Sequence, residues 1–151
     1  MGYRDGYCTP RWITRRLPWV DLDPASNPRS TVKARRSCML ERGENGLLVS
    51  WRGLSIFCNP PFSDVAPFAE KASEAESFCF LVNVDVSTRW RRRLTMFPSF
   101  TFPFYSRIEF EAPEGIETSR NDSPQEFICD PAFRERIGDA FKGYGEWWKN
   151  F

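Results

Sequence analysis

The sequence predicts an α/β fold whose β-sheet is mostly parallel, with an antiparallel pair at one edge. Residues 54–58 are a short apolar run of strand-forming residues, and residues 78–86 are a longer run of the kind buried on both faces of a parallel sheet. Between them, residues 63–76 have apolar positions at helical spacing, with Ser63 or Asp64 as the expected cap. A strand, helix and strand in this order predict a right-handed crossover, which brings the carboxyl ends of both strands to one edge of the sheet.

Two elements are expected before this unit. Thr9-Pro10 combines residue types that open helices, so we expect a short helix that Pro18 ends. Residues 19–24 alternate as a strand and end in Asp23-Pro24, followed by small and polar residues. Ligands of open α/β sheets lie beyond the carboxyl ends of the strands. Asp23 is therefore the best acidic candidate for a nucleoside site, although a cap or turn role explains it equally well.

The segments on either side of the crossover unit carry less specific signals. Between residues 29 and 50 the clearest element is a brief strand at 38–40. Residues 87–93 predict a helix with four arginines around Trp90, namely Arg89, Arg91, Arg92 and Arg93. Such a cluster is typical both of a phosphate-binding surface and of a solvated helix face.

The last third of the chain predicts a hairpin and a helix. Residues 100–112, with a strand core at 107–110, should pair with residues 127–129 as an antiparallel hairpin across a turn at 113–124. Apolar residues at steps of three and four from Phe133 to Trp148 predict a C-terminal amphipathic helix over residues 131–151.

Length and charge limit the class of protein. A chain of 151 residues is most simply a single domain covering residues 1–151, and a net charge of +1 gives no global attraction to polyanions, so any nucleic-acid contact must be local. Histidine is absent, which excludes the common zinc sites, the Ser-His-Asp triad and the Cys-His dyad.

Cysteine usage and hydropathy predict the compartment. The five cysteines are odd in number and scattered through apolar runs, which favours buried thiols in a reducing cytoplasm over a disulfide framework. No secretory segment and no apolar run of about 20 residues is evident. We therefore expect a cytoplasmic protein with no metal, no membrane association and no obligate protein partner.

The most informative stretch is the end of the strand at 54–58. It stops at Asn59-Pro60-Pro61-Phe62, in which two prolines fix successive φ angles and confine Asn59 to extended conformations. An amide, free main-chain carbonyls and a flat apolar ring are thus held together at a strand end. A proline-rich turn is the structural alternative.

Asn-Pro-Pro-Phe resembles the signature of methyltransferases that modify amino groups with S-adenosylmethionine, and the order of features resembles the phage-type DNA N6-adenine methyltransferase (Dam-like) family. That family shows Thr-Pro near the start, an acidic strand end before a small residue, Gly-Leu shortly before a Trp, Cys-Asn-Pro-Pro-aromatic, Thr-x-Trp, and Arg-x-x-Phe. This chain has these as Thr9-Pro10; Asp23-Pro24-Ala25; Gly46-Leu47 and Trp51; Cys58 to Phe62; Thr88 and Trp90; and Arg107 with Phe110. The likeness is strongest over residues 9–130.

The resemblance implies a fold, a cofactor and a set of site residues. The fold is a Rossmann-like methyltransferase fold with a mostly parallel seven-stranded sheet, helices on both faces and an antiparallel edge strand. The implied partners are S-adenosylmethionine and DNA, in host cytoplasm if the protein is phage-encoded. The cofactor contacts would be Thr9, Pro10, Asp23, Ala25 and Cys58; the catalytic tip would be Asn59, Pro60, Pro61 and Phe62, which hold a flipped adenine; and DNA would meet Arg89, Arg91, Arg92, Arg93 and Arg107.

Two features of the sequence leave other functions open. Methyltransferases at large have a Gly-x-Gly turn after the first strand, where this chain has residues 25–28 as Ala-Ser-Asn-Pro, and their acidic residue before Gly-Leu is Asn45 here, with Glu44 beside it. The chain could thus be a catalytically silent nucleic-acid-binding module. The same four-residue tip also occurs in enzymes that methylate RNA adenine or the glutamine side chains of proteins.

Overall fold

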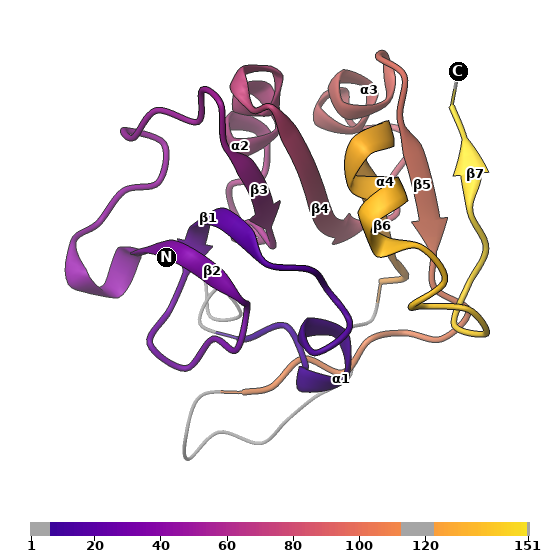
Figure 1. The fold of residues 1–151 in the computed structure, drawn as a ribbon, viewed down its shortest axis with the longest axis horizontal. Helices are drawn as coiled ribbons and strands as arrows, with labels where there is room; N and C mark the ends of the chain where they lie inside the picture. Colours follow the sequence, from indigo (N-terminus) through magenta and orange to yellow (C-terminus); the bar gives the residue numbers. More distant parts are fainter. Residues whose placement is uncertain (1–6, 113–122, 151) are drawn as a thin grey trace.

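A computed structural model describes residues 7–112 and 123–150, which form a mixed α/β structure around one seven-stranded sheet (Figure 1). The strand order across the sheet is β2-β1-β3-β4-β6-β5-β7. The strands are β1 (Val20–Ser26), β2 (Ala34–Met39), β3 (Ser55–Cys58), β4 (Ser77–Asn83), β5 (Phe100–Pro103), β6 (Gln125–Cys129) and β7 (Trp148–Lys149).

The predicted crossover unit is confirmed. Strands β3 and β4 pair in parallel from Ser55↔Ser77 to Cys58↔Phe80, and β1 pairs in parallel with both β2 and β3. The connecting helix α2 (Ala66–Lys71) continues as the 3₁₀ turn η2 (Ala72–Glu74). Its expected caps are wrong, because α2 begins after Val65 with no side-chain cap. Strand β4 ends at Asn83, three residues earlier than expected.

The antiparallel part of the sheet differs from the prediction in position. Strand β6 is antiparallel to both β4 and β5 and lies between them, so the first reversed strand is internal, and β7 is antiparallel to β5 at the edge. Pairing of the segment after residue 100 with residues 127–129 is confirmed, but its strand is β5, not the expected core at 107–110. Residues 107–110 alternate in burial because Ile108 and Phe110 pack into the core beside the sheet.

The predicted C-terminal helix is mostly wrong. Helix α4 (Pro131–Ile137) is capped by the Asp130 side chain, which accepts from Phe133 N, and it ends at Gly138, whose φ is 56°. The chain then turns back and forms the short edge strand β7. The apolar spacing misled the prediction because Phe133 and Phe141 are buried in one aromatic cluster although only the first is helical.

Two apolar clusters cover the two faces of the sheet. On one face, α4 and the short helix α1 (Arg11–Thr14) pack with Phe57, Phe102 and Phe127; on the other, α2 and α3 (Arg89–Thr95) pack with Trp51, Ile56 and Phe80. Described residues therefore cover both faces of the sheet, and the strand ends are where an open α/β sheet is expected to hold a ligand. Within the described residues, no helix is both long and apolar enough to cross a membrane.

Candidate active site

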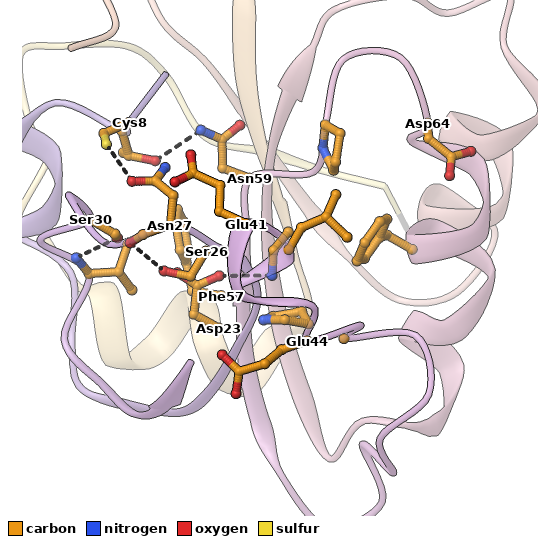
Figure 2. A pocket seen from close by; sticks show the side chains of 18 of the residues that line it. Cys8, Asp23, Ser26, Asn27, Ser30, Glu41, Glu44, Phe57, Asn59 and Asp64 are labelled. Atoms are coloured by element: carbon orange, nitrogen blue, oxygen red, sulfur yellow. Dashed lines mark hydrogen bonds between the residues drawn. The ribbon is translucent and has the colours of Figure 1, made fainter. Parts of the chain in front are cut away.

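A cavity of about 280 Å³ opens at the carboxyl ends of β1 and β3 (Figure 2). Its wall combines apolar side chains from several elements with four carboxylic acids. The apolar side chains include Val32, Leu40, Leu47, Phe57 and Phe68, and the acids are Asp23, Glu41, Glu44 and Asp64. Such a lining suits a ligand that has a flat apolar part and a positive charge.

Asp23 is the most deeply buried acid of this cavity, with 3% of its surface exposed. The register of β1 against β2 shifts between Asp23 and Ser26, so the strand bulges where the carboxyl group turns into the cavity. Ala25 N donates to Asp23 Oδ1 (3.2 Å), and the Ser26 hydroxyl gives a second hydrogen bond. Burial outweighs both bonds and raises the pKa of Asp23 to about 7.

Gly46 closes the cavity behind the tip of β1. A Cβ atom at Gly46 would lie 1.9 Å from the main-chain oxygen of Pro24, so no other residue fits there without moving the strand. The indole of Trp51 donates to Gly46 O (2.9 Å) and holds the loop in place, and the Asn45 side chain accepts from Leu47 N (2.9 Å). Gly46 and Leu47 of the sequence pattern therefore line the cavity beside Pro24, and Trp51 supports their loop without lining the cavity.

The segment before α1 forms another wall. Cys8 exchanges two main-chain hydrogen bonds with Glu111 (2.8 and 3.0 Å), and its thiol donates to Asn27 Oδ1 (3.1 Å). Thr9 is buried, yet its hydroxyl does not cap α1, whose N-cap residue is Pro10. Instead, Thr9 Oγ1 accepts a hydrogen bond from Asn59 Nδ2 (3.0 Å). The expected capping role of Thr9 is therefore wrong, and a contact with the strand tip replaces it.

The tip after β3 separates two cavities. Asn59 and Pro61 line the 280 Å³ cavity, whereas Pro60 and Phe62 line a neighbouring cavity of about 170 Å³. Further lining of the smaller cavity comes from the end of β4 and the start of α3, namely Leu81, Val82, Asn83, Asp85, Thr88 and Trp90. The Phe62 ring is partly buried and meets Phe110 edge to face, with 5.7 Å between ring centroids. Residues that alternate along one rigid tip thus face two adjacent cavities.

A family model described as DNA N-6-adenine-methyltransferase (Dam) matches residues 2–139. The chain belongs to this family. It is 28% identical over 137 residues to the DNA N-6-adenine-methyltransferase of Haemophilus phage HP1 (strain HP1c1), which covers 83% of this chain and 78% of that protein. No solved structure matches the chain.

The structure brings some of the expected cofactor contacts of this Dam-family chain together and leaves others apart. Thr9, Asp23 and Ala25 line the 280 Å³ cavity together with two residues of the tip. Pro10 and Cys58 lie beside it without lining it, and Cys58 is buried against the α2 face of the sheet. Residues that the sequence reasoning did not select also line the cavity, namely Cys8, Asn27, Glu41 and Glu44. Only Glu44, two residues before Gly46 and beside Asn45, had a signal in the sequence that could have identified it.

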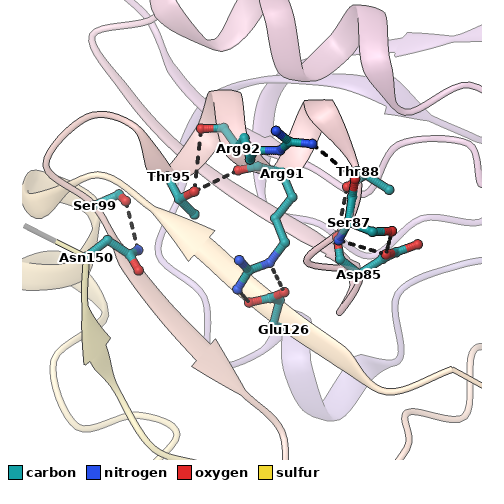
Figure 3. A network of polar contacts seen from close by, with 9 residues as sticks. All are labelled: Asp85, Ser87, Thr88, Arg91, Arg92, Thr95, Ser99, Glu126 and Asn150. Atoms are coloured by element: carbon teal, nitrogen blue, oxygen red, sulfur yellow. Dashed lines mark hydrogen bonds and ion pairs between the residues drawn. The ribbon is translucent and has the colours of Figure 1, made fainter.

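The arginines of α3 fall into two groups in this Dam-family chain. Arg91 forms a two-pronged ion pair with Glu126 (Figure 3), at 2.8 and 2.9 Å. Glu126 is completely buried. Arg89, Arg92 and Arg93 are exposed, as is Arg107 beyond β5. Arg91 therefore stabilises the fold between α3 and β6, and the other four arginines remain accessible to a polyanion. Among the described residues, no group of three His, Cys, Asp or Glu side chains could hold a metal ion.

Proposed function

We propose that this protein transfers a methyl group from S-adenosylmethionine to the N6 amino group of adenine in DNA. The observation that carries the proposal is the Asn59–Phe62 tip, which stands between one cavity with acidic and apolar walls and a second, aromatic one. The family supports adenine and DNA as the target, and the two cavities give the donor and the acceptor separate places that meet at one rigid tip.

The 280 Å³ cavity has the chemistry that S-adenosylmethionine requires. Bound there, the cofactor would supply a methyl group activated by its sulfonium centre. Asp23 provides a carboxyl group for the positively charged amino-acid end, and the apolar side chains of Leu40 and Phe57 provide surface for the adenosine. The Gly-x-Gly turn is dispensable in this arrangement, because the bulge of β1 and the close approach of Gly46 to Pro24 form the wall instead.

The amino group of adenine is a weak nucleophile, because its lone pair is delocalised into the purine ring. Two hydrogen-bond acceptors that bind the N–H groups of this amine make its nitrogen more tetrahedral, and the tip can provide them. Asn59 Oδ1 and the Pro60 carbonyl are these acceptors in our proposal, so no strong base is needed and the absence of histidine is accounted for. The neighbouring 170 Å³ cavity would receive the flipped base beside Phe62, with Trp90 on its wall.

The DNA surface is proposed at the same edge of the sheet. Strands β4 and β5 run in the same direction, because both are antiparallel to β6. The helix α3 follows β4, and exposed Tyr105 and Arg107 follow β5, so aromatic and cationic side chains lie after the same ends of these two strands as the smaller cavity. We expect the exposed arginines Arg89, Arg92, Arg93 and Arg107 to bind DNA phosphates. We also expect the chain to form a single methyltransferase domain. It would act in the cytoplasm, which is the host cytoplasm if the gene is a phage gene.

The test is a methyl-transfer assay with S-adenosylmethionine and unmethylated DNA, followed by digestion and mass spectrometry for N6-methyldeoxyadenosine. The Asn59→Ala variant should lose at least about 100-fold in transfer rate and keep its affinity for the cofactor, because it removes an acceptor used only during transfer. Asn150→Ala is the matched control, since Asn150 bonds Ser99 next to the edge strand β7.

Other outcomes of this assay distinguish the alternatives. Cofactor binding by calorimetry without DNA methylation would contradict the proposal and point to RNA adenine or protein glutamine as the acceptor. Absence of both binding and transfer in the wild-type protein would leave a nucleic-acid-binding module without catalysis.

A further inference from the structure

The hydrogen bond between Thr9 and Asn59 joins two segments that are 50 residues apart. An asparagine amide has a donor end and an acceptor end, and one side chain cannot present both in the same direction. Asn59 Nδ2 is held at Thr9 Oγ1 (3.0 Å), so the oxygen of the amide turns the other way, as Figure 2 shows. Within residues 7–112 and 123–150, no group donates a hydrogen bond to Asn59 Oδ1.

Thr9 is itself held firmly. Only 4% of its surface is exposed, and the preceding residue, Cys8, is bound through its main chain to Glu111 and through its thiol to Asn27 at the end of β1. The prolines fix the backbone after Asn59, but they leave the amide free to rotate about its side-chain bonds. The hydroxyl of Thr9 is therefore the contact that sets the direction of the amide.

We propose that Thr9 is a positioning residue, which orients the Asn59 amide so that its oxygen stays available to the amino group that is methylated. This inference rests on the proposed function and assigns Thr9 a part in the transfer step in addition to its place on the cavity wall. A flipped amide would present Nδ2 to the substrate amine, and two donors would then face each other. Orientation of this kind is established before the substrate binds and reduces the reorganisation needed for transfer.

The experiment compares Thr9→Val, which keeps the shape and removes the hydroxyl, with Thr9→Ser, which keeps the hydroxyl. Single-turnover methylation of DNA with saturating cofactor should be about 10–100-fold slower in Thr9→Val and within about threefold of the wild type in Thr9→Ser. The dissociation constant for S-adenosylmethionine, measured by calorimetry, should change less than about twofold in both. In the Asn59→Ala background, Thr9→Val should cause no further loss, because both substitutions remove the same function.

A second measurement is independent of activity. In ¹⁵N-labelled protein, the Asn59 side-chain NH₂ signal, assigned by its absence in Asn59→Ala, should exchange its protons with water slowly in the wild type and in Thr9→Ser, and at least about tenfold faster in Thr9→Val. Unchanged exchange in Thr9→Val would contradict the hydrogen bond, and faster exchange with unchanged transfer would contradict the positioning role. A tenfold weaker affinity for the cofactor in Thr9→Val, with single-turnover transfer at saturating cofactor unchanged, would also overturn the inference, because Thr9 would then act only through cofactor binding. If the wild-type protein does not methylate DNA, the proposed function fails, and a role for Thr9 in transfer fails with it. The proton-exchange data would still decide whether the hydrogen bond between Thr9 and Asn59 exists.

Discussion

Asp21 and Asp23 lie two residues apart on β1, yet their surroundings shift the pKa values of the two carboxyl groups in opposite directions. Asp21 Oδ2 accepts hydrogen bonds from Ser55 N (2.9 Å) and Ser55 Oγ (3.1 Å), and Arg35 lies 3.9 Å from its other oxygen. The main-chain bond from Ser55 is the largest cause of a lowered pKa for Asp21. Asp23 has no ion-pair partner among the described residues, and burial raises its pKa to about 7.

The difference in pKa between Asp21 and Asp23 indicates at which ends of the strands a ligand would bind. Asp21 lines a cavity of about 380 Å³ at the opposite edge from Asn59, where Arg35 and Arg136 lie among the acids. At that edge, Ser55 of β3 and Arg35 of β2 are the partners of Asp21. At the carboxyl ends of the strands, β1 bulges between Asp23 and Ser26, and no described residue forms an ion pair with the Asp23 carboxyl group. A buried acid in this state is a common sign of a functional site.

Glu126 extends the comparison, because it is buried like Asp23 but paired with Arg91. The variant Arg91→Met should turn it into a second unpaired acid and lower the free energy of unfolding by about 3–5 kcal/mol at neutral pH. The control Arg92→Met removes an exposed arginine on the same helix and should cost less than about 0.5 kcal/mol. Urea unfolding measures both, and equal losses would show that the Arg91–Glu126 pair has no special structural role.

Removing the charge of Asp23 should have the opposite effect on the unliganded protein. The pKa of Asp23 in the folded state, about 7, lies above its ordinary value of 3.8, so the folded state holds this proton more tightly. Its contribution to stability is complete below about pH 4 and is lost as the pH rises through 7. Asp23→Asn should therefore be more stable than the wild type by about 2–4 kcal/mol at pH 8 and equally stable near pH 4. Urea titrations at the two pH values check this, and a pH-independent difference would contradict it.

The same substitution should weaken binding of the cofactor. At pH 8 we expect Asp23→Asn to raise the dissociation constant for S-adenosylmethionine about 10–100-fold, which is about 1.4–2.8 kcal/mol, because a neutral amide cannot compensate a positive charge. Asp21→Asn, on the same strand, should change it less than about twofold. Calorimetry with both variants makes the comparison, and a similar loss in both would mean that the substitutions act through the strand as a whole.

These comparisons also show how far the sequence determines the site. The strand at 54–58, its rigid tip and the acid at the end of β1 could be predicted because each depends on local chemistry: an apolar run, two prolines and a strand end. The wall around Glu41 and the bond from Asn59 to Thr9 could not, since they depend on distant segments meeting in space.

Errors in the predicted elements have the same cause. The spacing of apolar residues from Phe133 to Trp148 fits a helix, but α4 ends at Gly138, whose φ is 56°, and a second glycine with positive φ, Gly143, follows. Phe141 is buried from a turn, whereas Tyr144 and Trp148 are exposed. The arginines of α3 look equivalent in the sequence, and only the position of Glu126 on β6 separates Arg91 from the others.

The smallest expected effect concerns Asp21 itself. Its carboxyl group is more than a third exposed, so solvent screening limits what its bonds contribute, and Asp21→Asn should lower the free energy of unfolding by only about 0.5–1 kcal/mol at pH 7. Because the pKa of Asp21 is lowered in the folded state, its contribution is present above the ordinary value of 3.8 and disappears as the pH falls through the lowered one. Unfolding titrations from pH 6 to pH 3 should therefore show the wild type and Asp21→Asn converging in acid, whereas the wild type and Asp23→Asn diverge as the pH rises. If the wild type and Asp21→Asn instead diverged as the pH rose through 7, Asp21 would behave as Asp23 does, and the contrast between the two edges of the sheet would fail.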